Sequence, residues 1–316
     1  MVIVASPAWV GQGPRSPVPL VPLAISSFVG DTRLMTARWI VGIDGSDAAV
    51  DALRWAVGHG AERDVDISAL GAFHVPGLMA AFTAKRGFGV DELGLAATAG
   101  HEVDVAIEAV AGAGVDVQSM VIEGQAQHVL VDSSVDADLL VIGRTGSGEL
   151  RHHLLGSVSQ YCVTHSHAPV AVVPKDASER TTASIVVGFD GSDHGADAVR
   201  WALDFAGERA AVHVVAAIEV APWVDEAATR ERFGNEIDAE EQRITEALDA
   251  VDPDGRAERS IVMSGPREAL ADAQDGADLV VVGTRGRGLL AAGLLGSVST
   301  WLLHDSKLPI VVVPGR

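Results

Sequence analysis

Residues 137–159 read ADLLVIGRTGSGELRHHLLGSVS, and residues 277–299 read ADLVVVGTRGRGLLAAGLLGSVS. In each stretch an apolar run leads into a glycine, two further residues and a second glycine, and nine residues later the pair Gly-Ser follows. One spaced-glycine pattern is often no more than loop punctuation. Two copies with the same spacing and the same flanks indicate a duplicated domain that binds a phosphorylated ligand.

The duplication extends well beyond these loops. Residues 40–57 read IVGIDGSDAAVDALRWAV and residues 186–203 read VVGFDGSDHGADAVRWAL, while APVAVVP at 168–174 matches LPIVVVP at 308–314. A period of about 140 residues is the size of a complete domain. We therefore expect two domains, at residues 37–175 and 183–316, joined by a short polar connector.

Residues 1–36 have no counterpart in the second repeat and contain five prolines. Proline interrupts each apolar stretch, so no membrane helix of about 20 residues fits. No basic segment of the kind that opens a secretory signal precedes them. We interpret residues 1–36 as a disordered leader, nearly all of which would be absent from a chain that starts at Met35. We also predict that the protein is cytoplasmic.

The chain is strongly acidic, with a formal net charge of -20. Such a charge opposes binding to nucleic acids and to anionic lipid, so we expect neither as a partner. Its simplest role is to keep the protein in solution. The single cysteine, Cys162, excludes an intrachain disulfide, and its apolar neighbours indicate a buried structural thiol.

Apolar runs alternate with helical segments in both repeats. In the first repeat we expect strands at 39–43, 67–75, 115–122, 139–142 and 170–173, and helices at 47–59, 101–111, 126–133 and from 157 onward. In the second repeat we expect strands near 185–189, 212–220, 257–263, 279–282 and 310–313. Strands without polar alternation are typical of a parallel sheet covered on both faces. The predicted fold class is α/β, with two doubly wound, five-stranded, Rossmann-like parallel sheets in tandem.

The last strand of each repeat would leave an apolar sheet edge exposed, and proteins usually cover such edges. We therefore expect residues 170–173 to pair with residues 310–313. Trp55 and Trp201 occupy matched helical positions and are expected to pack in the core or between the two lobes.

The first strand of each repeat ends in Asp-Gly-Ser, at residues 44–46 and 190–192, and the fourth ends in a glycine loop. In doubly wound sheets, ligands bind beyond the carboxyl ends of the strands where the strand order reverses. If the first and fourth strands are neighbours, both motifs face one crevice. Asp44 could then accept a hydrogen bond from a ribose hydroxyl or adenine amine, or hold Mg²⁺. The alternative is that Asp44 only caps the first helix.

The glycine loop has a chemistry that suits phosphate. Gly143 lacks a Cβ and so lets a ligand approach the strand end, and Gly146 permits a turn that other residues resist. Gly156 and Ser157 open a helix, whose free N–H groups and positive dipole end favour an anion. Ser157 and Ser159 add hydroxyl donors.

These features resemble the universal stress protein family. Its ATP-binding pattern is Gly, two residues, Gly, nine residues, Gly, then Ser or Thr, which both loops satisfy. The opening V-G-x-D-G-S and the ending P-V-x-V-V-P are also similar, and the resemblance covers residues 37–316.

The resemblance implies one adenine nucleotide in each domain, ATP with Mg²⁺. Asp44 and Asp190 would lie near the ribose and the metal, Val75 and Val220 beside the adenine, and the glycine loops around the ribose and phosphates. The expected binding residues are Asp44, Gly45, Ser46, Val75, Gly143, Arg144, Gly146, Gly156, Ser157, Val158, Ser159, Asp190, Gly191, Ser192, Val220, Gly283, Arg285, Gly286, Arg287, Gly296, Ser297, Val298 and Ser299.

The two loops differ in their basic residues. The second loop carries Arg285 and Arg287, whereas the first has Arg144 followed by Ser147. The planar guanidinium suits phosphate, so the second site is expected to bind more tightly. The alternative is that these arginines face water.

Neither loop is a GxxxxGK[ST] phosphate loop, and neither shows the acidic residue that a dinucleotide site needs about 20 residues on. We assign no catalytic residue. The favoured function is that of an ATP-binding regulator of the stress response or of growth arrest. A slow ATPase or phosphotransfer enzyme and an interaction scaffold with vestigial sites are the alternatives, and a homodimer is left open.

Overall fold

The computed structural model describes residues 3–5, 36–75, 94–145, 155–175, 177, 182–219, 226–287 and 294–315. The strands are β1 (Ile3–Ala5), β2 (Ala37–Ile43), β3 (Val65–Phe73), β4 (Val117–Glu123), β5 (Leu139–Gly143), β6 (Val170–Val173), β7 (Ser184–Phe189), β8 (Ala211–Ile218), β9 (Glu258–Met263), β10 (Leu279–Gly283) and β11 (Ile310–Val313). The helices are α1 (Asp47–Gly60), α3 (Leu95–Glu108), α4 (Ala126–Ser133), α5 (Ser157–His165), α6 (Asp193–Ala206), α7 (Glu226–Val251), α8 (Pro266–Ala273) and α9 (Ser297–Asp305).

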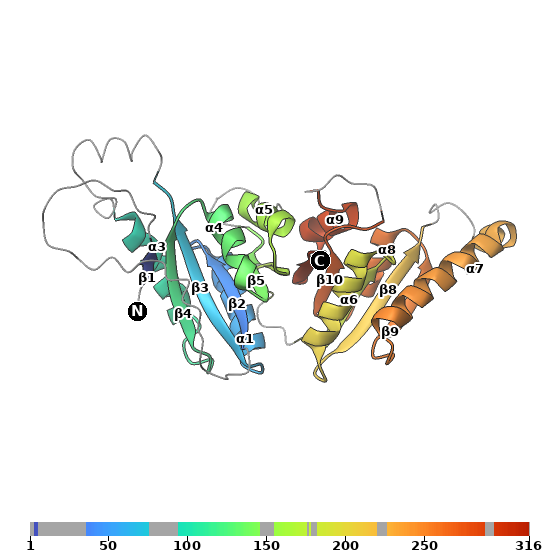
Figure 1. Cartoon of the computed structure of the whole chain (residues 1–316), viewed down its shortest axis with the longest axis horizontal. Coiled ribbons are helices and arrows are strands. Elements are labelled where there is room, and N and C mark those ends of the chain that lie inside the picture. Colours follow the sequence, from blue (N-terminus) through green and yellow to red (C-terminus); the bar gives the residue numbers. More distant parts are fainter. Residues whose placement is uncertain are drawn as a thin grey trace, which may run out of the picture.

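The strands form a single sheet in the order β1-β4-β3-β2-β5-β6-β11-β10-β7-β8-β9. Strands β2 to β6 with their helices form lobe 1, and β7 to β11 with theirs form lobe 2 (Figure 1). Within each lobe the strands are parallel, and the order reverses between β2 and β5 and between β7 and β10. The prediction of two doubly wound, five-stranded parallel sheets in tandem is confirmed.

Two layers of helices sandwich the sheet, and each layer continues across both lobes. Buried residues of α1, α3, α6 and α7 form one apolar cluster with one face of the sheet. Residues of α4, α5, α8 and α9 form a second cluster on the opposite face. Cys162 is fully buried in this second cluster, as predicted. Strands with apolar side chains on both faces follow from this double covering.

The lobes join by antiparallel pairing of β6 with β11, which places Val172 opposite Ile310. The predicted pairing of the last strands is therefore confirmed. Aromatic rings also meet at the junction. Phe205 of α6 stacks on Trp55 of α1 at 6.2 Å between centroids, and Trp201 stacks on Phe205 at 4.8 Å. The two matched tryptophans thus pack between the lobes.

The structure differs from the expected leader at residues 3–5, which form β1 and extend the sheet by pairing in parallel with β4. A backbone strand needs only an unpaired edge to pair with, which β4 provides. Residues 6–35 lie outside the described part of the chain.

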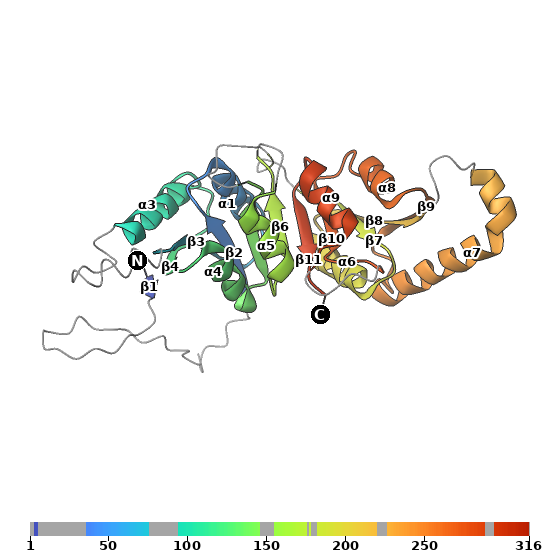
Figure 2. The same cartoon turned by 90° about the horizontal axis from the view of Figure 1, so that it is seen from above.

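Helix α3 begins at Leu95, six residues before the expected start at residue 101. The additional residues 95–100 are rich in alanine, which has a high helix propensity. Helix α7 extends beyond the body of lobe 2 in both views (Figure 1, Figure 2). Across the described ranges, none of the helices has both the length and the apolar character needed to span a bilayer.

Candidate functional site

The carboxyl ends of β7 and β10 open into a cavity of about 660 Å³ in lobe 2. Val215 and Ala217 of β8 and Leu270 of α8 give one part of the cavity an apolar lining. Asp190, the glycine loop and the start of α9 give the other part a polar lining. The two motifs that sequence analysis predicted would face one crevice thus come together at the reversal of strand order.

Asp190 connects the two motifs. Its Oδ1 accepts a hydrogen bond from the Ser192 N–H at 3.0 Å, and its Oδ2 accepts one from the Arg287 N–H at 2.7 Å. In lobe 1, Oδ1 of Asp44 accepts from the N–H and the hydroxyl of Ser46, at 3.1 and 2.5 Å. Neither aspartate caps a helix, so the alternative role considered for Asp44 is wrong.

The helix starts in each lobe fall into two kinds. Ser46 and Ser192 cap α1 and α6, because each hydroxyl accepts a hydrogen bond from the backbone N–H three residues on, at 3.2 and 3.1 Å. Helices α5 and α9 instead follow Gly156 and Gly296, which have no side chain to cap them. First-turn N–H groups have no partner within their helix. Helices α3, α4 and α8 also lack a side-chain cap, but the start of α9 lines the cavity, so its N–H groups are placed to meet an anion bound there.

The same backbone contacts close the base of both glycine loops. The Gly156 N–H donates to the Arg144 carbonyl, and the Gly296 N–H donates to the Thr284 carbonyl, each at 2.9 Å. The hydroxyls of Ser159 and Ser299 donate to the carbonyls of Gly143 and Gly283, each at 2.8 Å. This corrects the prediction that Ser159 is a hydroxyl donor to the ligand, because its proton already holds the end of β5.

The first glycine of each loop is needed for packing. A Cβ on Gly143 would lie 2.8 Å from the Ala48 carbonyl oxygen, and one on Gly283 would lie 2.7 Å from that of His194. These carbonyls belong to the first turns of α1 and α6. Gly143 was expected to be glycine so that a ligand could approach the strand end. The structure shows instead that a side chain at this position would collide with helix α1. A Cβ on Gly286 would meet Oδ2 of Asp190.

Arg144 does not reach toward the loop. Its Nη2 donates to the carbonyl of Ser306 at the end of α9, so the side chain crosses between the lobes. Burial lowers the pKa of Arg144, against the opposing effect of nearby Asp305. The prediction that Arg144 binds nucleotide is therefore corrected, because its guanidinium is committed to the lobe junction.

The remaining predicted residues are placed as follows. Gly45 and Gly191 have φ of 77° and 76°, a backbone conformation that favours glycine. Val75 is buried in a small apolar cluster with Phe73, Ala99 and Val121. Val158 and Val298 pack against the core on the first turns of α5 and α9, and Ser157 begins α5. Arg285, Ser297 and Val298 line the cavity of lobe 2. Gly146 and Val220 lie outside the described residues.

Comparison with known proteins decides the family. The profile of the universal stress protein family matches residues 35–174 and 182–314. The chain belongs to the universal stress protein family. It is similar to universal stress protein Rv2623 of Mycobacterium tuberculosis, with 32% identity over 298 residues covering 86% of this chain and 95% of the relative.

Solved universal stress proteins share the fold. One from Archaeoglobus fulgidus superposes with a TM-score of 0.62 at 17% identity, covering 89% of this chain and all of that one. A shorter universal stress protein, solved in complex with cAMP, has 24% identity and a TM-score of 0.34, covering 44% of this chain and 98% of its own.

Two residues of α7 in this universal stress protein were missed from the sequence: Glu240, which lines the cavity, and Arg243, which contacts Glu240 and Asp190. Nη2 of Arg243 donates to the Asp190 carbonyl at 3.2 Å, and Glu240 lines the cavity. Hydrogen bonding from Arg243, together with Arg287, lowers the pKa of Glu240 to about 2 despite its partial burial. The helical spacing of Ile237, Ile244 and Leu248 could have predicted helix α7. No sequence motif indicated that polar residues of this helix would lie at the cavity.

No three His, Cys, Asp or Glu side chains converge on a metal site within the described ranges of this universal stress protein. Each Asp-Gly-Ser motif supplies one carboxylate, Asp44 or Asp190. Mg²⁺ typically combines one or two carboxylates with phosphate oxygens and water. Either aspartate therefore fits a metal only as one ligand beside a bound polyphosphate.

Proposed function

We propose that residues 37–175 and 183–316 each bind one adenine nucleotide, ATP with Mg²⁺, and that occupancy regulates the protein in a stress response. The observation that carries this proposal is the uncapped start of α9, which faces a cavity also lined by Arg285 and Arg287. Backbone N–H groups at a helix start and guanidinium groups both suit phosphate.

The shape of the cavity supports a nucleotide as the ligand. Its volume of about 660 Å³ lies within the range of about 300–1,000 Å³ found for small-molecule pockets. The apolar part suits a base and the polar part a phosphorylated ribose. Lobe 1 repeats the base of the loop at Gly143 and Gly156, which supports a second site there.

The residues around the cavity favour binding over rapid turnover. Phosphoryl transfer needs an oriented nucleophile and stabilisation of charge at the terminal phosphate. Glu240, the carboxylate beside Arg287, is a poor general base because its two arginine partners hold its pKa at about 2. ATP hydrolysis should therefore be slower than the usual enzyme range of about 1–10³ per second.

Calorimetry with the full chain tests this proposal. We expect two ATP molecules per chain, weaker binding of GTP, and loss or about tenfold weakening of one site in Gly296→Ala. The added methyl meets nothing closer than 3.5 Å, so the fold should be unchanged while the methyl narrows the cavity.

Gly58→Ala is the matched control, since a Cβ there has nothing within 4 Å and lies on α1, away from the cavity lining. It should bind ATP like the wild type. Absence of adenine-nucleotide binding in the wild-type chain, or unchanged binding in Gly296→Ala, would overturn the proposal.

A further inference from the structure

Helix α7 brings a basic side chain against the Asp-Gly-Ser motif of lobe 2. A Cβ on Gly191 would lie 2.6 Å from Nη1 of Arg243. The same guanidinium donates to the Asp190 carbonyl at 3.2 Å. Arg243 therefore lies directly over the end of β7, at the edge of the polar part of the cavity.

A carboxylate lies between this arginine and the glycine loop. Oε1 and Oε2 of Glu240 accept from Nη2 and Nε of Arg243 at 3.0 and 2.9 Å. Oε1 also lies 2.6 Å from Nη1 of Arg287. A guanidinium binds two oxygens of a carboxylate or of a phosphate through the same paired hydrogen bonds, so the two arginines that hold Glu240 could also hold a phosphate.

This ionic cluster is not what holds α7 on the sheet. Ile237, Ile244 and Leu248 are buried on its inner face. Asp252, just after the helix, links its end to β9 through Arg259 at 3.4 Å. The Glu240 side chain retains 27% of its exposure, and both it and Arg287 line the cavity. The cluster can therefore rearrange without undocking the helix.

Lobe 1 has a different arrangement at the equivalent corner. There a Cβ on Gly45 would lie 2.9 Å from the carboxyl carbon of Glu102 on α3. Helix α3 contains no lysine or arginine. The carboxylate shared by two arginines thus belongs to the corner of lobe 2, and the corresponding corner of lobe 1 carries a carboxylate beside the Asp-Gly-Ser motif.

We infer that Arg243 and Arg287 form the subsite for the distal phosphates of a nucleotide in lobe 2, and that Glu240 occupies this subsite until a polyphosphate displaces it. The inference rests on the proposed function of the cavity. A nucleoside monophosphate reaches the start of α9 without displacing Glu240. A triphosphate must compete with the carboxylate, so Glu240 sets the preference of lobe 2 between them.

The test compares AMP and ATP binding to the full chain in the presence of Mg²⁺, in the wild type, Glu240→Gln and Glu236→Gln. Hydrogen–deuterium exchange of residues 294–303 reports occupancy of lobe 2, and exchange of residues 155–163 reports lobe 1. Glu240→Gln should strengthen ATP binding to lobe 2 by about tenfold and change AMP binding by less than about twofold, because only ATP competes with the carboxylate. Glu236, exposed on the same helix, provides the control for loss of one negative charge and should leave both affinities unchanged.

Arg243→Gln gives the opposite expectation, a loss of about tenfold in ATP affinity with AMP affinity retained. Equal affinities of wild type and Glu240→Gln for ATP, or parallel changes for AMP and ATP, would overturn the inference while leaving nucleotide binding intact. If neither nucleotide protects residues 294–303 in any variant, the proposed function itself is wrong.

Discussion

His59 is a buried histidine in α1 whose two ring nitrogens are both used. Nδ1 lies 2.7 Å from the Trp55 carbonyl oxygen, and Nε2 lies 2.6 Å from the Thr182 hydroxyl. A carbonyl can only accept, so Nδ1 carries the proton and Nε2 accepts from Thr182. The neutral ring therefore satisfies both contacts, and it joins α1 to the segment that enters lobe 2.

Stability should fall in mild acid because of this residue. Burial lowers the pKa of His59 from 6.5; the hydrogen bond to Trp55 opposes this shift, and nearby Arg63 adds to it. Below pH 6.5 the unfolded chain binds a proton at His59 that the folded chain does not. The free energy of unfolding should then decrease by up to about 1.4 kcal/mol per pH unit until the folded pKa is reached.

Urea unfolding at pH 7.5 and pH 5.5 measures this effect. His59→Gln should lose less stability than the wild type over this interval, because glutamine does not titrate. His101→Gln, on the exposed surface of α3, should lose as much as the wild type. Identical losses in the wild type and His59→Gln would contradict the assignment.

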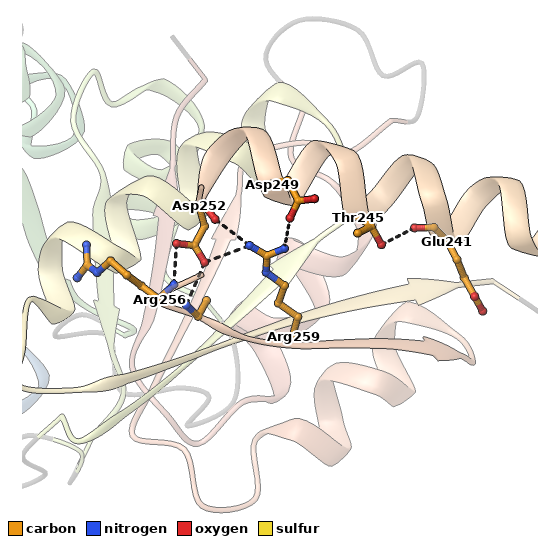
Figure 3. Close-up of polar contacts among 7 residues, drawn as sticks. Glu241, Thr245, Asp249, Asp252, Arg256 and Arg259 are labelled. Atoms are coloured by element: carbon orange, nitrogen blue, oxygen red, sulfur yellow. Dashed lines mark hydrogen bonds and ion pairs between the residues drawn. The ribbon is translucent and has the colours of Figure 1, made fainter. Parts of the chain in front are cut away.

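At the scale of elements, the end of α7 is tied to β9 by a buried aspartate (Figure 3). Asp252 accepts from the N–H groups of Arg256 and Ala257 at 2.9 and 3.0 Å, while Arg259 spans Asp249 and Asp252. Burial would raise the pKa of Asp252, but these N–H groups and Arg259 lower it below its ordinary value. The carboxylate thus shapes the turn that returns the chain from helix to sheet.

Asp252→Ala should destabilise the protein by about 1–3 kcal/mol, since it leaves buried N–H groups without acceptors. Asp249→Ala removes the exposed partner of the same arginine. It should cost less than about 1 kcal/mol, because exposed ion pairs contribute little. Urea titration of the two variants measures the free energy of unfolding that each has lost. Equal losses in the two variants would show that Asp252 acts only as a surface charge.

At the scale of the whole molecule, the antiparallel pair of β6 and β11 makes two lobes into one sheet. Val172 and Val312 are almost fully buried there, within the apolar cluster that both lobes share. Because the edges are paired with each other, neither is available to a foreign strand.

A charge at this junction should separate or unfold the lobes. Val172→Glu and Val312→Glu should each cost more than about 3 kcal/mol, because the carboxylate has no partner in the apolar cluster. Calorimetric melting and small-angle scattering would show a lower Tm or a larger radius of gyration. Val135→Glu, at a position 60% exposed, is the control and should behave like the wild type. Unchanged melting and compactness in both junction variants would contradict the prediction.

The sequence alone determined the duplication, the parallel strands and the pairing of the last strands, because these depend on local periodicity and on repeated spacing. It also located Asp190 and the glycine loop of lobe 2 at one crevice, since strand ends are marked by local motifs. Only the tertiary structure decided that Arg144 turns to Ser306 and that Gly283 is needed by α6. It alone brought Glu240 of α7 to the crevice and Arg243 to the Asp190 carbonyl beside it. These contacts join residues far apart in the chain. They depend on how the helices pack against the sheet, and no local sequence pattern encodes that packing.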